Sequence, residues 1–375
     1  MPRETAPGER RVALTPDAVR RLVRVGVEVV VERGAGASAF VTDAAFQAAG
    51  ARLGTRPDAL GADGVATVKG LAADDLAHVR DGAIVVGLLR PLDEPEALAG
   101  LAERGATAVA MELVPRISRA QKMDALSAMS TVAGYRAVLL AAERLPKFFP
   151  LLTTAAGTVR PARVLVLGAG VAGLQALATA RRLGAVTSAY DVRAAAREQV
   201  ESVGAAFVEL DLGAGDAEDA GGYAKALTEA QLTLQRDQLA ALVADVDVVV
   251  TTALIPGRPA PLLLTDAAVA ALAPGSVVVD LAAPNGGNCA ATVPGETVEV
   301  GGVSVVGPLD LAADMPLHAS DMYGRTVAAL VTEFLGDDGR FAVDLEDEIL
   351  AGAVVTHGGA VVHPRVLALL PEATG

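Results

Sequence analysis

The 375-residue sequence is poor in cysteine, histidine and aromatic residues: it has one cysteine, four histidines, no tryptophan and only 3% aromatic residues. Because Cys289 stands alone, a disulfide within the chain is excluded, and a cytosolic setting is the simplest interpretation. No histidine–cysteine pair has the spacing of metal ligands, so we expect no metal site. No stretch approaches the roughly 20 apolar residues of a membrane span, and the first residues lack the apolar core of a secretory signal.

Positive charge is also scarce. The chain has 31 Lys and Arg against 45 Asp and Glu, which gives a net charge of −14. Phosphate backbones select basic surfaces, so this balance argues against a nucleic-acid partner, and solubility is the ordinary explanation for it. At 375 residues the chain is long enough for two or three domains, each with its own core.

Helix and strand signals alternate along the first third of the chain. Thr15 and Pro16 mark the start of a first helix, and Gly26 marks its end. Such alternation is typical of a parallel sheet with crossover helices. We expect strands at residues 27–32, 64–69, 83–89 and 107–113, and a further helix at 43–50.

A long helical signal at about residues 124–145 connects this region to a second one. Residues 147–162, with several Pro and Thr, are expected to form a loop. The doubly wound pattern then resumes and ends in a hairpin turning at Gly301–Gly302. A final helix at about 320–335 is expected to return to the first domain. The sequence therefore predicts an α/β protein with two doubly wound, parallel-sheet (Rossmann-like) domains and a nucleotide cleft between them. The predicted domains are 1–125 plus about 311–375, and 126–310.

A glycine-rich motif follows the strand signal "RVLVL". Gly168, Gly170 and Gly173 form G-x-G-x-x-G at the mouth of a helix. In dinucleotide sites the first glycine permits a tight turn, the second lets the backbone approach the pyrophosphate, and the third lets helix and strand pack closely. The helix N-terminus supplies N–H groups to the phosphates. We therefore assign these glycines, with Val171 and Ala172 between them, to a dinucleotide site.

An acidic residue completes this fingerprint. Asp191 ends the next strand signal, about 20 residues after the motif. A carboxylate there accepts a hydrogen bond from the ribose 2′-hydroxyl and repels a 2′-phosphate, so we expect NAD(H) rather than NADP(H). Val192 and Arg193 follow in the same cofactor-binding segment. Because Asp191 takes the ribose position, we interpret the charges of Arg193 and Arg197 as helix-surface charges.

A group for the proton chemistry of a small substrate is harder to find. Arg11 and Lys69 could hold a carboxylate, but neither has a histidine partner, and surface charges are the simpler interpretation. In "RISRAQKMDALS", Gln121, Asp124 and Ser127 recur every three residues, which places them on one face of a helix or tight turn. Spacing alone leaves two interpretations open: an exposed first helical turn, or a surface that recognises an amide and a sugar.

Six segments carry a resemblance to a known family. They are "AMELVPRISRAQKMDALSAMSTVAGYRA", "TTAAGTVRPARVLVLGAGVAGLQALATARRLGA", "DVRAAAREQVESVGA", "AGGYAK", "TTALIPGRPAP" and "VVVDLAAPNGGNC". Together they resemble domain I, the NAD(H)-binding component, of proton-translocating NAD(P) transhydrogenases, over nearly the whole chain. The resemblance implies direct hydride transfer between NADH on this chain and NADP+ on a partner domain. No acid or base is needed for such a transfer.

The resemblance also implies roles for individual residues. Arg116 and Ser127 hold the nicotinamide carboxamide, Asp124 helps to position the ring, and Gln121 reaches the ribose of the partner's nucleotide. Arg116, Gln121 and Asp124 are therefore the candidate catalytic residues. Tyr223 lies on a loop that closes over the bound nucleotide. The implied partners are an NADP(H)-binding domain, membrane-spanning subunits and a second copy of the chain, which place it in the cytoplasm, peripheral at the inner face of the membrane.

Two alternatives remain. Alanine dehydrogenase shares much of this pattern but depends on a histidine in the segment matching "VVGLLRPL" and an aspartate in the segment matching "AAPNGG". This chain has Leu89 and Arg90 in the first segment and Pro284 and Asn285 in the second, so amino-acid oxidation is expected to be feeble or absent. The other alternative is a non-catalytic NAD(H)-binding protein. The polar set within residues 116–127 argues against it, because binding alone needs no group that reaches a second nucleotide.

Overall fold

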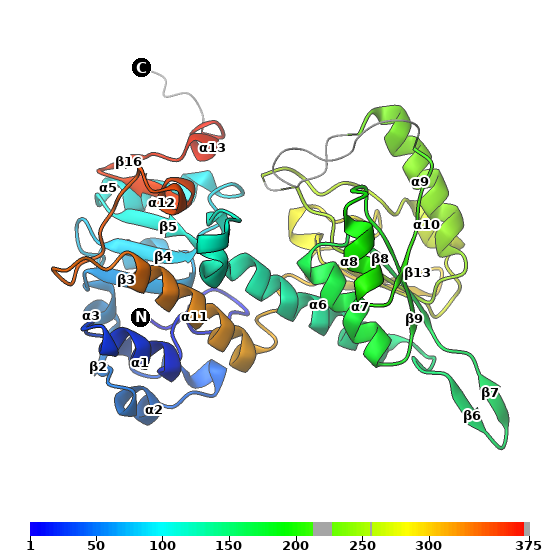
Figure 1. Ribbon diagram of the computed structural model, residues 1–375, viewed down its shortest axis with the longest axis horizontal. Helices are drawn as coiled ribbons and strands as arrows, with labels where there is room; N and C mark the ends of the chain where they lie inside the picture. Colours follow the sequence, from blue (N-terminus) through cyan, green and yellow to red (C-terminus); the bar gives the residue numbers. More distant parts are fainter. Residues whose placement is uncertain (213–226, 256, 371–375) are drawn as a thin grey trace. The chain divides into compact units, whose positions relative to one another are not determined.

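The computed structural model describes residues 1–212, 227–255 and 257–370. Contacts divide the chain into two compact units (Figure 1). Unit 1 comprises Met1–Met129 and Ala312–Gly375, and unit 2 comprises Ser130–Leu311. Unit 2 is thus inserted into the sequence of unit 1.

The core of unit 1 is a five-stranded sheet in the order β16-β15-β5-β4-β3. The first three strands in the sequence are parallel, and β15 joins β5 in the antiparallel sense. A separate parallel pair, β1 with β2, lies nearer the N-terminus. The strands are β1 (Val30–Glu32), β2 (Arg52–Gly54), β3 (Gly64–Lys69), β4 (Ile84–Leu88), β5 (Thr107–Ala110), β15 (Val354–His357) and β16 (Ala360–Val361).

Helices cover the strands of unit 1. The predicted first helix is present: α1 starts with Pro16 at its first position, and Gly26, just beyond its end, has a φ of +87°. The predicted returning helix, α11, packs against α1 and so belongs to unit 1. The helices are α1 (Pro16–Arg24), α2 (Asp43–Ala48), α3 (Arg56–Leu60), α4 (Ala73–Leu76), α5 (Ala99–Glu103), α11 (Pro316–Glu333), α12 (Glu348–Ala353) and α13 (Pro364–Leu367).

Unit 2 contains a seven-stranded sheet in the order β10-β9-β8-β11-β12-β14-β13. The first six strands in this order are parallel, and their order is that of a doubly wound dinucleotide fold, in which the direction of winding reverses between β8 and β11. The strands are β8 (Arg163–Leu167), β9 (Val186–Tyr190), β10 (Ala206–Phe207), β11 (Val248–Thr251), β12 (Val277–Asp280), β13 (Thr297–Val300) and β14 (Val303–Val306). The central strands are Val- and Leu-rich and buried, as expected for a sheet covered on both faces.

Two hairpins in unit 2 had different outcomes. The predicted β13–β14 hairpin turns at Gly301 and Gly302, whose φ angles of +61° and +82° suit glycine. Within 147–162 the expected loop is wrong, because β6 (Leu152–Thr154) and β7 (Gly157–Val159) form an antiparallel pair. The turn of this pair has Gly157 at a φ of +121°. Figure 1 shows this hairpin extending away from the seven-stranded sheet.

The helices of unit 2 are α7 (Val171–Arg182), α8 (Ala196–Ser202), α9 (Glu229–Val243) and α10 (Asp266–Ala271). The long helix α6 (Ala125–Arg144) begins in unit 1 and continues in unit 2. By length and composition, α6 is apolar enough to cross a membrane, so the expectation that no stretch approaches a membrane span was wrong for this helix. However, Ala137, Val138 and Ala141 are fully buried in the core of unit 2, as in a core helix of a globular protein.

Candidate functional site

The three glycines form a sharp turn between β8 and α7. Gly168 has a φ of +100°, which favours glycine, and a Cβ there would lie 2.7 Å from Thr252 Oγ1. A Cβ at Gly173 would lie 1.9 Å from the Gly168 carbonyl oxygen, so only glycine lets α7 pack this closely on the turn. The first and third glycines are therefore required by the protein's own geometry.

The middle glycine differs. Gly170 has an ordinary φ of −76°, and a Cβ there would meet no protein atom within 4 Å. The backbone therefore presents an open face at the N-terminus of α7, a helix of 12 residues. The first N–H groups of a helix have no partner within it and bear partial positive charge. This geometry fits a dinucleotide pyrophosphate, which Gly170, Val171 and Ala172 would hold by backbone contacts.

Asp191 lies immediately after β9 and is tied to the glycine turn. Its Oδ2 accepts a hydrogen bond from Ala169 N at 2.8 Å, and its side chain is 6% exposed. Arg193 donates to both carboxylate oxygens, from Nε and Nη2, each at 2.9 Å. The prediction of Arg193 as a helix-surface charge was wrong, because the residue precedes α8 and forms an ion pair with Asp191. Arg197 does lie on α8 and forms ion pairs with Glu201 and Glu209.

Residues 116–127 lie in unit 1, in a segment held by buried side chains and by ion pairs. The short 3-10 helix η4 (Ser118–Met123) buries Ala120 and Met123. Arg119 donates to the Asp347 carboxylate at 2.5 and 2.6 Å, and Lys122 donates to Glu333 at 2.6 Å. These contacts fix the segment on α11 and α12.

The predicted functional side chains of this segment lie outside its anchors. Arg116 and Gln121 are exposed, while Asp124 and Ser127 are half-buried. Asp124 Oδ1 accepts a hydrogen bond from Ser127 N at 2.8 Å and so caps α6. Gln121, Asp124 and Ser127 therefore do not share one helix, because a 3-10 helix ends at Met123 and α6 begins at Ala125.

Comparison with known proteins identifies the family. The model of the alanine dehydrogenase/PNT N-terminal domain matches residues 1–133, and that of the corresponding C-terminal domain matches residues 137–364. The chain belongs to the alanine dehydrogenase/PNT family.

Three relatives show where in this family it lies. It is 46% identical to an NAD(P) transhydrogenase alpha subunit of Rhodospirillum rubrum, over 98% of each chain. A crystal structure of transhydrogenase from Sinorhizobium meliloti is 44% identical, with a TM-score of 0.86 over 96% of this chain and 99% of that one. Alanine dehydrogenase of Mycobacterium tuberculosis is 30% identical, over 98% of this chain and 95% of that protein. The α/β fold class and the resemblance to transhydrogenase are both confirmed.

The sequence analysis placed Arg11 on the surface of this alanine dehydrogenase/PNT family member, which is wrong. Arg11 is 3% exposed and donates from Nε and Nη2 to the two carboxylate oxygens of Glu9, at 2.8 and 2.6 Å. Lys69 Nζ lies 3.6 Å from the same carboxylate and is partly exposed. A buried cation needs such a counter-charge, and Glu9, itself buried, provides it within the chain.

Further ionisable groups are buried near the ends of the unit 1 strands. Glu4 accepts a hydrogen bond from Val68 N at 2.6 Å, and burial raises the pKa of Glu4 to about 7. Burial likewise raises the pKa of Glu112 to about 7, and its Oε2 has no hydrogen-bond partner. Burial also raises the pKa of Tyr323, which donates to the Thr67 carbonyl at 2.8 Å. This family member therefore carries a group of unusual carboxyls outside its nucleotide motif.

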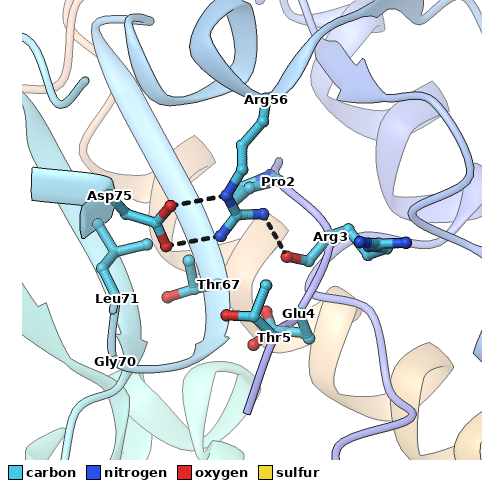
Figure 2. Close-up of a pocket in the computed structure, with 9 residues that line it drawn as sticks. All are labelled: Pro2, Arg3, Glu4, Thr5, Arg56, Thr67, Gly70, Leu71 and Asp75. Carbon is cyan, nitrogen blue, oxygen red and sulfur yellow. Dashed lines mark hydrogen bonds and ion pairs between the residues drawn. The ribbon is translucent and has the colours of Figure 1, made fainter. Parts of the chain in front are cut away.

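A small cavity lies beside the N-terminal segment of unit 1 (Figure 2). On one side of it, Arg56 donates from Nε and Nη2 to the Asp75 carboxylate, each at 2.6 Å. Its Nη1 donates to the Arg3 carbonyl at 2.8 Å and to Glu32 at 3.0 Å. All three guanidinium nitrogens are thus engaged by the protein, so these contacts tie the N-terminal segment down and leave the cavity a structural feature.

Two predictions cannot be compared with this structure. Tyr223, assigned to a closing loop, lies outside the described residues. Within residues 1–212, 227–255 and 257–370, no group of three or more His, Cys, Asp or Glu could hold a metal ion.

Proposed function

We propose that this chain is the NAD(H)-binding component of a proton-translocating transhydrogenase, and that it transfers hydride between NADH and NADP+ held by a partner domain. The observation that carries the proposal is the turn at Gly168, Gly170 and Gly173 with Asp191 beside it, in a chain 46% identical to a transhydrogenase subunit. When bound, the reduced nicotinamide supplies a hydride, leaving NAD+ on this chain and forming NADPH on the partner. Every other contribution comes from binding and orientation.

The choice of NAD(H) rests on the carboxylate of Asp191. Its Arg193 partner balances its charge and fixes its orientation, and the backbone N–H of Ala169 ties it to the glycine turn. A carboxylate held in this way accepts a ribose hydroxyl, and it would meet a 2′-phosphate with like charge. Val192 packs beside it against the core. We therefore assign NAD(H) to this chain and NADP(H) to the partner.

The anchored segment of unit 1 is assigned to the nicotinamide end of the reaction. We propose that Arg116 and Ser127 hold the carboxamide, that Asp124 orients the ring and that Gln121 reaches the partner's nucleotide. The anchoring of η4 supports these roles, because hydride transfer requires reacting atoms held about 3–3.5 Å apart in a water-poor site. The ion pairs of Arg119 and Lys122 reduce the freedom of the segment without using these four side chains.

Amino-acid oxidation is the weaker candidate. An alanine dehydrogenase must hold a carboxylate and move a proton. In this chain the Arg11 guanidinium is already paired with Glu9. The segment matching the dehydrogenase histidine has a buried Leu89, followed by Arg90 in a left-handed conformation with a φ of +52°. Neither residue transfers protons near neutral pH.

We also propose that the working unit contains two copies of this chain together with membrane-spanning subunits, at the cytoplasmic face of the membrane. The β6–β7 hairpin supports the two-copy assembly, because a two-stranded sheet alone is marginally stable in water. Leu151, next to this hairpin, is 59% exposed, and Val159 on β7 is 38% exposed. A second copy covering them would bury this surface.

The deciding experiment mixes the purified chain with an NADP(H)-binding transhydrogenase domain and follows hydride exchange between NADH and an oxidised NADP analogue by absorbance. We expect exchange in the mixture and none from the chain alone. A folded chain that binds NADH but gives no exchange with the partner domain would refute the transhydrogenase assignment. Formation of NADH from NAD+ and alanine by the chain alone would favour the dehydrogenase alternative.

A further inference from the structure

A buried carboxylate at the end of β12 organises the edge of the unit 2 sheet. Asp280 is fully buried and ends an otherwise all-valine strand. Its carboxylate accepts hydrogen bonds from five uncharged groups: Thr251 Oγ1 (2.7 Å), Ala282 N (3.0 Å), Asn288 N (2.7 Å), Cys289 N (3.1 Å) and Thr292 Oγ1 (2.7 Å). A carboxylate in so many hydrogen bonds is a rigid anchor for the loop after β12.

Asn288 in that loop holds the neighbouring loop, which follows β11. Its Nδ2 donates to the carbonyls of Ala253 and Pro261 at 2.9 and 2.8 Å, and its Oδ1 accepts from Ala253 N at 3.0 Å. The backbone carbonyl of Asn288 also accepts from Leu263 N and Leu264 N at 2.8 and 2.9 Å. The side-chain amide is thus used on both edges, and it fixes the backbone of Ala253 in both directions.

The segment held by Asn288 lies against the glycine turn. Thr252 donates from its N to the Leu167 carbonyl and from its Oγ1 to the Gly168 carbonyl, each at 2.8 Å. Strands β11, β12 and β14 make up the second mononucleotide-binding half of the sheet, whereas the glycine motif and Asp191 belong to the first. The network therefore serves the half that receives the second mononucleotide of a dinucleotide.

We propose that Asp280 and Asn288 are positioning residues for the nicotinamide half of NAD(H), acting through the backbone of residues 252–254. The inference rests on the proposed function, since it requires that unit 2 bind a dinucleotide. Leu254, next to the fixed Ala253, is 46% exposed and supplies an apolar wall at this edge. A wall held in place before binding loses little conformational freedom when the ligand arrives.

The test compares NADH with ADP-ribose, which lacks the nicotinamide. Dissociation constants for both ligands are measured by calorimetry on the full chain, as wild type, Asn288→Ala and Thr292→Val. Valine has the shape of threonine but removes one donor to Asp280. Ser276→Ala is the matched control, because Ser276 also makes a buried hydrogen bond, to the Val246 carbonyl, but at the opposite end of β12.

We expect Asn288→Ala to weaken NADH binding about tenfold and Thr292→Val to weaken it by a smaller factor. ADP-ribose binding should stay within about twofold of wild type in both variants, and Ser276→Ala should match wild type for both ligands. If Asn288→Ala does not fold, Thr292→Val decides the question, because it removes a single hydrogen bond.

The outcomes separate the two proposals. Wild-type protein that binds neither ligand would refute the proposed function. Wild-type protein that binds both, with variants that bind NADH equally well, would refute only the positioning role. An equal loss of NADH and ADP-ribose, or the same loss in Ser276→Ala, would indicate general damage to unit 2 and would also overturn the inference.

Discussion

The contrast between Gly170 and Gly173 gives a test that separates ligand binding from folding. Both glycines belong to the same motif and lie three residues apart. A Cβ at Gly170 meets no protein atom within 4 Å, whereas a Cβ at Gly173 lies 1.9 Å from the Gly168 carbonyl oxygen. We therefore expect Gly170→Ala to fold normally and bind NADH poorly, and Gly173→Ala to lose stability.

The magnitudes follow from these geometries. For Gly170→Ala, a less flexible unfolded chain favours the variant by about 0.4–1 kcal/mol, and the poorer helix cap disfavours it by a similar amount. The net change in the free energy of unfolding should be within about 1 kcal/mol. For Gly173→Ala the added methyl must displace backbone, and overpacking of this kind costs about 1–3 kcal/mol or more.

Loss of binding in Gly170→Ala comes from the pyrophosphate. A methyl group at the closest backbone approach pushes the phosphates away from the N–H groups of α7, and each charge-assisted hydrogen bond contributes about 1.5–3 kcal/mol. One such bond lost weakens NADH about 10- to 150-fold. NADH fluorescence titration measures the dissociation constant, and urea unfolding measures the stability. Unchanged NADH affinity in Gly170→Ala, at unchanged stability, would refute the assignment of this turn to the pyrophosphate.

Three further changes probe other parts of the molecule. Asp191→Ser should weaken NADH binding and, by freeing the cation of Arg193, raise the affinity for NADPH about tenfold relative to wild type; ligand titrations that leave NADPH as weak as before would contradict this. The pKa of Glu112, raised by burial from 4.5 to about 7, means that the native state keeps a proton that the unfolded state releases. Stability should therefore fall between about pH 4.5 and 7, and Glu112→Gln should reduce that fall in urea unfolding at pH 5 and pH 7.5; an identical fall in the variant would argue against it. Arg119→Ala should leave NADH binding to unit 2 unchanged but lower the rate of hydride exchange several-fold, because it frees η4 from Asp347; an unaltered exchange rate would show that this anchor is dispensable.

The parts of the fold that the sequence predicts well are those determined by neighbouring residues. The turn at Gly168, the hairpin at Gly301–Gly302 and the first helix after Thr15 depend on local backbone conformation, and each is present. The order of strands in unit 2 follows from the alternation of helices and strands together with the preference for right-handed crossovers. The roles of residues 116–127 toward the nicotinamide remain predictions.

The features that were missed depend on contacts between distant residues. Nothing near Arg11 in the sequence indicates that it is buried, because its exposure depends on packing that includes Met129, a residue 118 positions away. Strand β15 comes from the C-terminal segment and pairs with β5 in a register that no local pattern reveals. Asp280 was overlooked for the same reason, although an aspartate that ends a run of valines is a usable signal. A charge in that place must find buried donors.

The division of unit 1 into two stretches of sequence has a consequence for synthesis on the ribosome. The residues of unit 2 are all made before α11 and β15, which belong to unit 1 and contact its N-terminal portion. The glycine turn can therefore fold, and be ready for its nucleotide, while the first 129 residues still await their last strand and helix. Until then the free edge of β5 is an unpaired template, and early capture of nucleotide by unit 2 cannot protect it.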